Sequence, residues 1–470
     1  MNRPAAAKPS LEEKRIVIVG GGLAGLAAAV ALADRGLHIE LFEAKQTLGG
    51  RAGSFRDLET GELIDHCQHV ALGCCTNFLH FCERTGCSDL LERHQRLHFF
   101  SATGQRSDFV AASWLPAPLH LLPTMLRIKY LSWREKLGIG RAMLALMRMP
   151  ANSQQRIRTV ADWLQQMRQT PTAVERFWKV VLISALAESL DNIDLAAARK
   201  VFIDGFLASR VAADVIIPRV SLAELYDERI AGWLTARGVT LHLGTPVKQI
   251  AAAENHFLKM QTTEREFHAA AVIAAVPWTQ IRRVIAEPLF AQLPNAGGID
   301  KIESSPISSV HLWTDRRIMD LPHAVLIDRL SQWVFARKDL GNQQGHYYQV
   351  VISASRELSG RPQAEVTDEV WRDLQAVFPA ARDSRLIRAR LLTQRDAVFR
   401  GYEKRVSQVT SHPSLFLAGD WTATGWPATM EGAVRSGYLA AEKVLSSFGI
   451  HEKILQADLP SSWLARLLIG

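Results

Sequence analysis

The chain has 470 residues, of which 48% are hydrophobic and 22% charged, and this composition excludes a mainly disordered protein. Its length predicts two or three domains that share interfaces. The net charge of +8 permits an acidic partner. The chain carries no zinc-finger, helix-turn-helix or RNP signature, however, so we expect no nucleic-acid partner.

The five cysteines all fall within one short segment. An odd number of cysteines without a secretory signal predicts reduced thiols. The segment has no C-x-x-C pair and its spacing fits no common zinc site, so we expect no metal ion. These cysteines are Cys67, Cys74, Cys75, Cys82 and Cys87.

Basic residues gather between Arg127 and Arg158, where eight Lys or Arg side chains stand against the single acid Glu135. The same stretch is rich in Trp, Leu and Met, a composition typical of helices that lie on a membrane surface. An ordinary amphipathic helix with a solvated basic face explains it equally well. At the C-terminus, the pattern from Trp463 to Ile469 predicts an amphipathic helix. With no apolar run of 18 residues, we expect a cytoplasmic protein, free or peripheral on the inner face of the membrane.

The N-terminal region has the pattern of a parallel β-α-β unit. A buried strand, an Ala/Leu-rich helix and a second strand are expected over 14–19, 23–35 and 39–42. Between the first strand and the helix stands Gly20-x-Gly22-x-x-Gly25. Its glycines allow a tight turn, close approach of a pyrophosphate and close helix packing, while the helix N-terminus faces the phosphates. Glu43 ends the second strand, where a carboxylate accepts ribose hydroxyls. The unit therefore predicts dinucleotide binding.

The remaining elements predict an α/β protein whose Rossmann-type domain is discontinuous. Helices are expected over 161–167, 173–190, 195–206, 222–237, 367–377 and 430–445, and strands over 271–276, 309–312, 325–327, 347–353 and 415–417. We assign the dinucleotide domain to 1–75, 216–300 and 401–450, a mainly helical, membrane-facing region to 76–215, the sheet of a mixed α+β substrate domain to 301–400, and an amphipathic tail to 451–470.

Three further motifs resemble known flavoproteins. Leu48-Gly49-Gly50-Arg51-Ala52 resembles the second signature of the amine-oxidase-like FAD superfamily, which includes phytoene desaturases. The stretch from Leu417 to Gly437 resembles the closing motif of carotene desaturases and their squalene-associated relatives. The segment from Ile64 to Cys74 resembles the hydroxysqualene dehydroxylases, although His66 and Cys67 replace the Asn-Gly of that family's pattern.

The resemblance implies FAD as cofactor. Arg51 would continue the pyrophosphate site, Asp420 would accept ribityl hydroxyls, and the helix from Thr429–Met430 would direct its N-terminus at the flavin ring. The expected FAD-binding residues are Gly20, Gly22, Leu23, Ala24, Gly25, Glu43, Ala44, Gly49, Gly50, Arg51, Ala52, Gln68, His69, Val247, Gly419, Asp420, Ala428, Thr429 and Met430.

The resemblance also implies a reaction, the reductive dehydroxylation of hydroxysqualene to squalene. A proton donor would help the allylic hydroxyl to leave, and reduced FAD would deliver hydride to the resulting cation. Asp65 and His69 are the candidate acids, although His69 fits a hydrogen-bonded core histidine equally well. No second G-x-G-x-x-G exists, so an external electron donor is expected. The alternatives are a carotene-type desaturase, which runs the flavin in the opposite sense, a flavin amine oxidase, and a non-catalytic FAD-binding scaffold.

Overall fold

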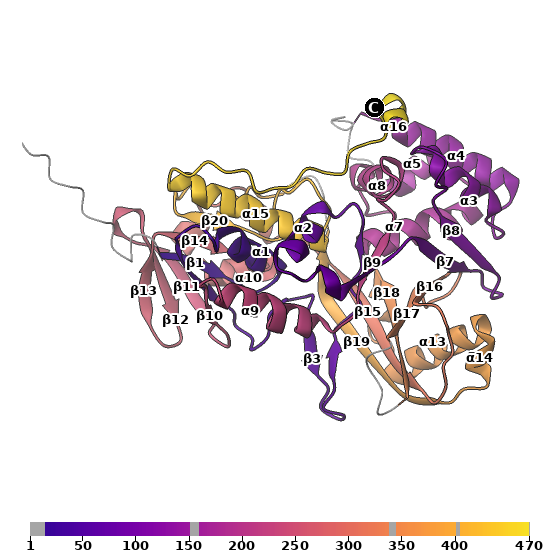
Figure 1. Ribbon diagram of the computed structural model, residues 1–470, viewed down its shortest axis with the longest axis horizontal. Helices are drawn as coiled ribbons and strands as arrows, with labels where there is room; N and C mark the ends of the chain where they lie inside the picture. The colour runs from indigo at the N-terminus through magenta and orange to yellow at the C-terminus, as the bar shows by residue number, and fades with distance from the viewer. Residues whose placement is uncertain (1–14, 151–158, 338–344, 401–404, 470) are drawn as a thin grey trace, which may run out of the picture.

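The structure, a computed structural model, describes residues 15–150, 159–337, 345–400 and 405–469. Its elements form two sheet-centred parts, which Figure 1 shows side by side, with a group of helices next to the second sheet. Residues 156 and 158 of the predicted basic stretch lie outside the described residues, as do residues 1–14.

The first part is a five-stranded parallel sheet that draws its strands from distant stretches of the chain. The strand order is β10 (Thr240–His242), β2 (His38–Phe42), β1 (Arg15–Val19), β14 (Ala271–Ala274) and β20 (Leu415–Leu417). Every pair in this sheet is parallel. The sheet is therefore discontinuous in sequence, as the buried apolar runs predicted.

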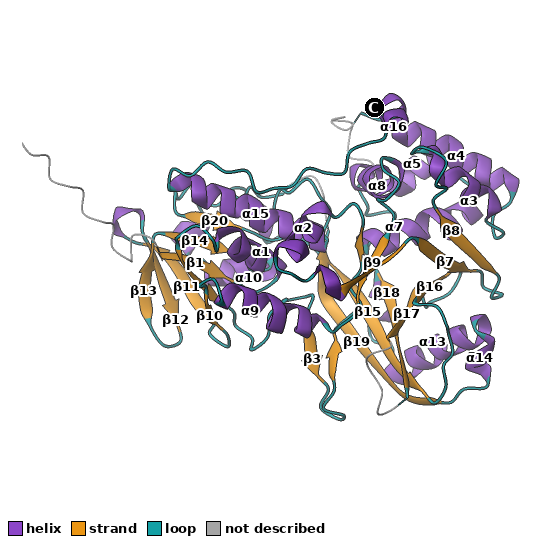
Figure 2. Cartoon of the chain, in the orientation of Figure 1, coloured by secondary structure: helices purple, strands orange, loops and turns teal. Residues whose placement is uncertain are grey.

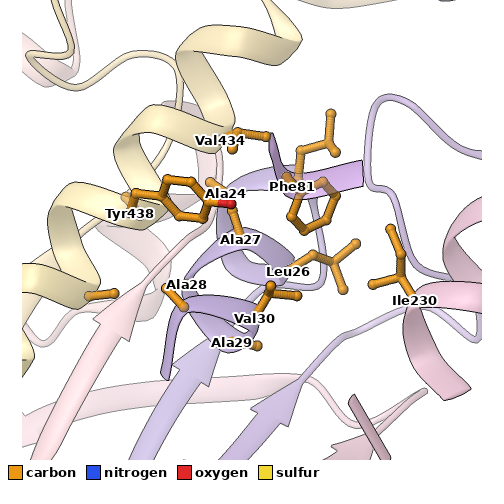
Figure 3. Packing of buried hydrophobic residues seen from close by; sticks show 14 of the residues in the cluster. Ala24, Leu26, Ala27, Ala28, Ala29, Val30, Phe81, Ile230, Val434 and Tyr438 are labelled. Carbon is orange, nitrogen blue, oxygen red and sulfur yellow. The ribbon is translucent and has the colours of Figure 1, made fainter. Parts of the chain in front are cut away.

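Both faces of the parallel sheet are covered, which explains why its strands are apolar throughout. Ile16 and Ile18 face a core shared with α1 (Leu23–Leu32) and α15 (Met430–Ser447). Figure 3 shows the alanines of α1 meeting Val434 and Tyr438 of α15. The two helices approach closely, since a Cβ on Gly437 would lie 2.2 Å from the Ala24 carbonyl oxygen. The opposite face packs on α10 (Trp278–Val284) and on the small antiparallel sheet of β11 (Val247–Ala252), β12 (Leu258–Thr262) and β13 (Glu266–Ala269).

The second part is a seven-stranded sheet, visible in orange in Figure 2. One face packs on α13 (Gln363–Val377) and α14 (Pro379–Arg382), and the other turns toward the parallel-sheet part. Its order is β19 (Leu386–Phe399), β15 (Ser304–Thr314), β18 (His346–Ser353), β17 (Trp333–Arg337), β16 (His323–Leu326), β7 (Arg96–Phe100) and β8 (Arg106–Val110).

Two of these strands, β7 and β8, belong to the region expected to be mainly helical, and β6 (Leu91–His94) is a third strand there. Their short length and interspersed Arg and His residues hide the alternation of a strand. The long strand β19 was also absent from the sequence-based assignment, because six of its fourteen residues are polar and twelve of the fourteen are half-exposed or exposed. Pairing with β15 decides its conformation.

The helical group contains α3 (Leu122–Arg127), α4 (Trp133–Arg148), α5 (Val160–Gln166), α7 (Lys179–Leu186) and α8 (Leu195–Phe202), which share one hydrophobic core. A capping box between Ser132 and Glu135 starts α4. The C-terminal helix α16 (Trp463–Leu468) packs on this group through Leu468 and the following Ile469. No helix in the described ranges is long and apolar enough to cross a membrane.

Candidate functional site

The glycine turn after β1 has the geometry of a phosphate cradle. Gly20 has a φ of +111°, and a Cβ there would lie 2.5 Å from the Ala275 carbonyl oxygen. A Cβ on Gly25 would lie 1.9 Å from the Gly20 carbonyl oxygen, so the helix packs directly on the turn. Gly22 is the N-cap of α1, which places the amides of Leu23 and Ala24 in its first turn. No acidic side chain stands in that turn, so the helix N-terminus is suited to an anion.

The Gly49-Gly50 pair lies directly beside the first glycine turn. Gly22 and Gly49 form a parallel bridge, and the Gly49 amide donates to the Gly21 carbonyl oxygen at 2.9 Å. A Cβ on Gly50 would lie 3.1 Å from the Gly22 Cα. Buried Ala52 closes the second turn through its amide, which donates to the Gly49 carbonyl oxygen at 3.0 Å. Two backbone segments without side chains therefore meet where a pyrophosphate would bind.

Glu43 stands at the edge of this cradle. Its carboxylate accepts hydrogen bonds from the backbone amides of Gly21 (2.6 Å) and Lys45 (2.9 Å). The Glu43 carbonyl oxygen accepts from the Thr245 amide at 2.9 Å, which brings the start of β11 and its first residue, the buried Val247, toward this end. Ala44 is exposed. The residues predicted to hold the adenosine half therefore gather at one end of the parallel sheet.

The other end of the predicted cofactor site is built around Arg51 and Asp420. One guanidinium nitrogen of Arg51 donates to the Asp420 carboxylate at 2.5 Å, and another donates to the Ala397 carbonyl oxygen at 2.8 Å. The guanidinium also lies over the Trp278 ring, 5.3 Å from its centroid. Asp420 is buried and lies three residues after the end of β20.

The helix that follows Asp420 begins at the same place. The Thr429 hydroxyl caps α15 by accepting from the Gly432 amide at 3.1 Å, and Met430 is its first residue. The preceding Ala428 is half-buried against the core below the sheet. The Gly419 amide donates to the Ser436 hydroxyl at 2.8 Å, which fixes the turn onto the helix. The two glycine turns and the closing motif therefore meet at one site. The residues there fit FAD at both its pyrophosphate and its flavin end.

Asp65, one of the two candidate acids, is a buried acceptor. Its Oδ1 accepts from the Ser54 hydroxyl (2.7 Å) and from the Leu222 amide (2.8 Å). Its Oδ2 lies 3.3 Å from the guanidinium of Arg337, which is also buried. Two hydrogen bonds to Oδ1 and the nearby guanidinium hold this carboxylate between segments, while Oδ2 is buried without a hydrogen-bond partner among the described residues. That Asp65 donates a proton stays a prediction.

His69, the second candidate, has one nitrogen engaged. Its Nδ1 lies 2.9 Å from the Cys67 carbonyl oxygen, and because a carbonyl only accepts, Nδ1 carries the proton and Nε2 does not. Burial lowers the pKa of His69, and the positive charge of nearby Arg51 lowers it further, against the opposing effects of the Cys67 carbonyl and Asp65. At neutral pH this imidazole is neutral and offers an acceptor nitrogen.

Two residues that sequence reasoning missed organise this region. Arg337, on β17, donates to the Gln68 side-chain oxygen at 2.7 Å. Glu431, in the closing motif, accepts from the Asn77 and Phe78 amides and so caps α2 (Thr76–Arg84). Burial raises the pKa of Glu431, and the hydrogen bonds from Phe78 and Asn77 oppose that rise. Glu431 lies within the closing motif, but its partner 353 residues away was invisible in the sequence.

The cysteines contribute no site of their own. Cys74, Cys75, Cys82 and Cys87 are buried free thiols, and Cys67 is half-buried. Burial raises the pKa of Cys67 to about 12, and it raises the pKa of Cys82 well above its ordinary range. Over the described ranges, no group of three or more His, Cys, Asp or Glu side chains is arranged to hold a metal ion.

A discontinuous parallel sheet, a glycine cradle and a closing Gly-Asp turn before a helix define a flavoprotein that binds FAD. The comparisons agree, and the chain belongs to the family of flavin containing amine oxidoreductases, whose sequence profile matches residues 23–445. It is an FAD-dependent oxidoreductase.

Similar proteins span nearly the whole chain. A hydroxysqualene dehydroxylase from Rhodopseudomonas palustris is 27% identical over 458 residues, covering 92% of this chain and 99% of that protein. A 15-cis-phytoene desaturase from Synechococcus elongatus is 24% identical over 464 residues, covering 92% and 96%. Among solved structures, an oxidoreductase from Methanosarcina mazei superposes with a TM-score of 0.70 at 14% identity, covering 92% and 100%. That superposition supports the fold.

Proposed function

We propose that this enzyme removes the hydroxyl group of hydroxysqualene reductively and yields squalene. The observation that carries the proposal is a run of apolar side chains that starts beside the Gln68–His69 segment. Val70 and Leu72 join Phe99, Trp333 and Val351 of the seven-stranded sheet in one cluster. Phe109 belongs both to this cluster and to the next, which includes Phe206, Met143 and Leu468. Apolar side chains packed in this way suit contact with a long hydrocarbon better than contact with a polar amine.

The reaction balances with one external reductant. The allylic C–O bond breaks, the hydroxyl leaves with one proton as water, and a C–H bond forms at the same carbon. Bound FAD in its reduced form supplies the hydride, and a diffusing electron donor restores the two electrons. The chain's own contribution is to exclude water, to orient the substrate and to move the proton. His69 is the candidate for the proton, because its Nε2 is the ring nitrogen that the Cys67 carbonyl does not hold, and Nε2 becomes a donor when the imidazole is protonated.

A carotene-type desaturase is the second candidate, favoured by the similarity to phytoene desaturases. That reaction oxidises a polyene and needs a proton acceptor in place of a donor. An anaerobic assay separates the two. If the proposal holds, protein with chemically reduced FAD reoxidises when hydroxysqualene is added and forms squalene in equal amount. Reduction of oxidised FAD by a polyene, with no turnover of hydroxysqualene, would establish the desaturase. A non-catalytic scaffold would do neither.

We also propose that the helical group docks on the inner face of the membrane, because a substrate of this kind resides in lipid. On α4, Trp133, Leu137 and Leu144 form one exposed stripe. It lies opposite the buried face of Ile139, Ala142 and Leu146. Exposed Arg134, Arg141 and Arg148 recur every seven residues and flank the stripe.

Tertiary packing brings the C-terminal helix to the same surface. Figure 1 shows α16 next to α4, and Leu468 packs in one cluster with Met143 of α4. Trp463 and Leu467 of α16 are 66% and 75% exposed. Nine of the fourteen exposed large hydrophobic residues in the described part of the chain lie on this surface: Trp114, Leu119, Leu122, Leu126, Trp133, Leu137, Leu144, Trp463 and Leu467.

Sedimentation with lipid vesicles tests the docking surface. We expect binding to anionic vesicles that salt weakens without abolishing, since each basic residue near an anionic surface contributes about 1 kcal/mol. Leu137→Gln with Leu467→Gln should reduce binding. Ile387→Gln with Val409→Gln, which alters two exposed apolar residues elsewhere, is the matched control. Equal binding by both double variants, or none by the wild type at low salt, would refute the surface.

A further inference from the structure

We infer that Arg337 is a positioning residue of the cofactor site, which holds Gln68 in place from the opposite sheet. The inference rests on the proposed placement of the flavin ring beside the Gln68–His69 segment. Arg337 ends β17 and is buried, with 7% of its surface exposed. It belongs to the seven-stranded sheet, whereas Asp65, Gln68 and Val220, which it contacts, lie outside that sheet.

The guanidinium of Arg337 contacts three residues of two other segments. It donates to the Gln68 side-chain oxygen at 2.7 Å and to the Val220 carbonyl oxygen at 2.9 Å. It also lies 3.3 Å from the Asp65 carboxylate. A planar group with five fixed N–H donors suits such a junction, and a lysine ammonium reproduces it poorly.

Gln68 is fixed at both ends of its amide as a result. Its oxygen accepts from Arg337, and its nitrogen donates to the His69 carbonyl oxygen at 3.1 Å. His69 in turn donates to the Cys67 carbonyl oxygen. The orientation of the Gln68 amide and the direction of His69 Nε2 therefore depend on one side chain that comes from the other sheet.

Two simpler roles for Arg337 leave part of this geometry unexplained. The first role is binding of substrate by the positive charge of Arg337, but an uncharged isoprenoid offers no anion for it to bind. Neutralising the buried Asp65 accounts for the 3.3 Å contact, yet the shorter bond goes to Gln68, which is neutral. Asp65 already accepts from Ser54 and Leu222.

The experiment is a double-mutant cycle on the FAD-loaded protein without substrate. The variants are Arg337→Gln, Arg337→Lys, Gln68→Met and Asp65→Asn, alone and in pairs. The readouts are the Kd for FAD, the visible spectrum and reduction potential of the bound flavin, and the thermal midpoint. Arg356→Gln is the control, because it breaks a bidentate ion pair with Glu188 at 2.5 and 2.6 Å that Arg356 makes from the turn after β18.

We expect Arg337→Gln to raise the Kd for FAD on the order of tenfold and to shift the flavin spectrum and potential as Gln68→Met does. The pair should be no worse than either single variant, because both remove one interaction. Arg337→Lys should recover part of the spectrum. Adding Asp65→Asn to Arg337→Gln should restore the thermal midpoint while the flavin signals stay perturbed. The control should lower the midpoint alone.

These outcomes distinguish a failure of the inference about Arg337 from a failure of the proposed placement of the flavin ring. If Arg337→Gln with Asp65→Asn shows the wild-type spectrum and Kd, Arg337 only neutralises Asp65 and the inference is overturned. The same follows if Arg337→Gln leaves the flavin signals unchanged while Gln68→Met alters them. If Gln68→Met itself changes nothing, the flavin ring does not lie beside Gln68, and the proposed placement fails first.

Discussion

Arg51 and Asp420, which are 369 residues apart, form a hydrogen-bonded ion pair of 2.5 Å between the second glycine turn and the start of the closing motif. The pair joins the two ends of the chain across the cofactor site. We expect the Arg51 guanidinium to face the phosphates of bound FAD and the Asp420 carboxylate to face its ribityl chain.

Removing this carboxylate should weaken FAD binding and shift the flavin potential together. A charge-assisted hydrogen bond contributes about 1.5–3 kcal/mol, so Asp420→Ala should raise the Kd for FAD by roughly tenfold or more. Titration of the apoprotein and dye-equilibrated potentials measure both effects. Asp57→Asn is the control, because Asp57 is a buried carboxylate paired with Arg388 and Arg390 outside the site. If Asp420→Ala and Asp57→Asn raised the Kd for FAD equally, the assignment of Asp420 to the FAD site would be contradicted.

Glu43→Ala should weaken FAD retention by a similar factor and leave the flavin potential nearly unchanged. Its carboxylate lies at the adenosine end, beside the Gly21 amide, far from the reactive ring along the extended cofactor. Glu40→Gln is a matched change on the same strand, since Glu40 is held by Arg15 and His242. An unchanged FAD affinity in Glu43→Ala would show that the glycine turn binds something else.

The pH dependence of the reaction should report His69. Burial lowers the pKa of His69 below its ordinary 6.5, so the imidazole is neutral at pH 7 and becomes an acid only as the pH falls through that lowered pKa. The dehydroxylation rate should therefore rise toward acidic pH, and His69→Gln should flatten the profile. A desaturase would show the opposite slope, because the neutral imidazole then acts as the proton acceptor.

We expect Glu431 to stabilise the folded protein, because it caps the first turn of α2. Its carboxylate accepts from the Asn77 side chain at 2.9 Å and the Phe78 amide at 2.8 Å, both buried. Leaving such donors unsatisfied costs about 1–3 kcal/mol each, so Glu431→Ala should lower the thermal midpoint by several degrees. Glu431→Gln keeps one acceptor and should lose less. A midpoint equal to the wild type in Glu431→Ala would contradict the capping role.

The bound FAD should be noncovalent. The half-buried Cys67 thiol has a pKa raised to about 12 by burial, so it is protonated and a poor nucleophile. Acid precipitation of the yellow protein should release all the flavin into the supernatant. Flavin left on the precipitate would refute this.

Local sequence determined the ends of the cofactor site. Gly20 to Gly25 and Glu43 were predictable because strand, turn and helix signals stand within a few residues of each other, whereas Arg51 and Asp420 were predicted from the resemblance to flavoprotein motifs. Short-range sterics dictate such turns, as the close contact between Gly25 and the Gly20 carbonyl shows. The same reasoning predicted the buried strands and the discontinuous sheet.

Tertiary structure alone decided how these ends are held and what lies opposite them. Arg337 meets Gln68 across 269 residues, Glu431 caps α2, and β7 pairs with β16 in the seven-stranded sheet. Strand pairing and buried ion pairs are chosen by packing between distant segments, which no local pattern records. The surface shared by α4 and α16 has the same origin. The sequence determined that each helix is amphipathic. Only packing placed the two helices together, because the buried face of each helix needs a neighbour.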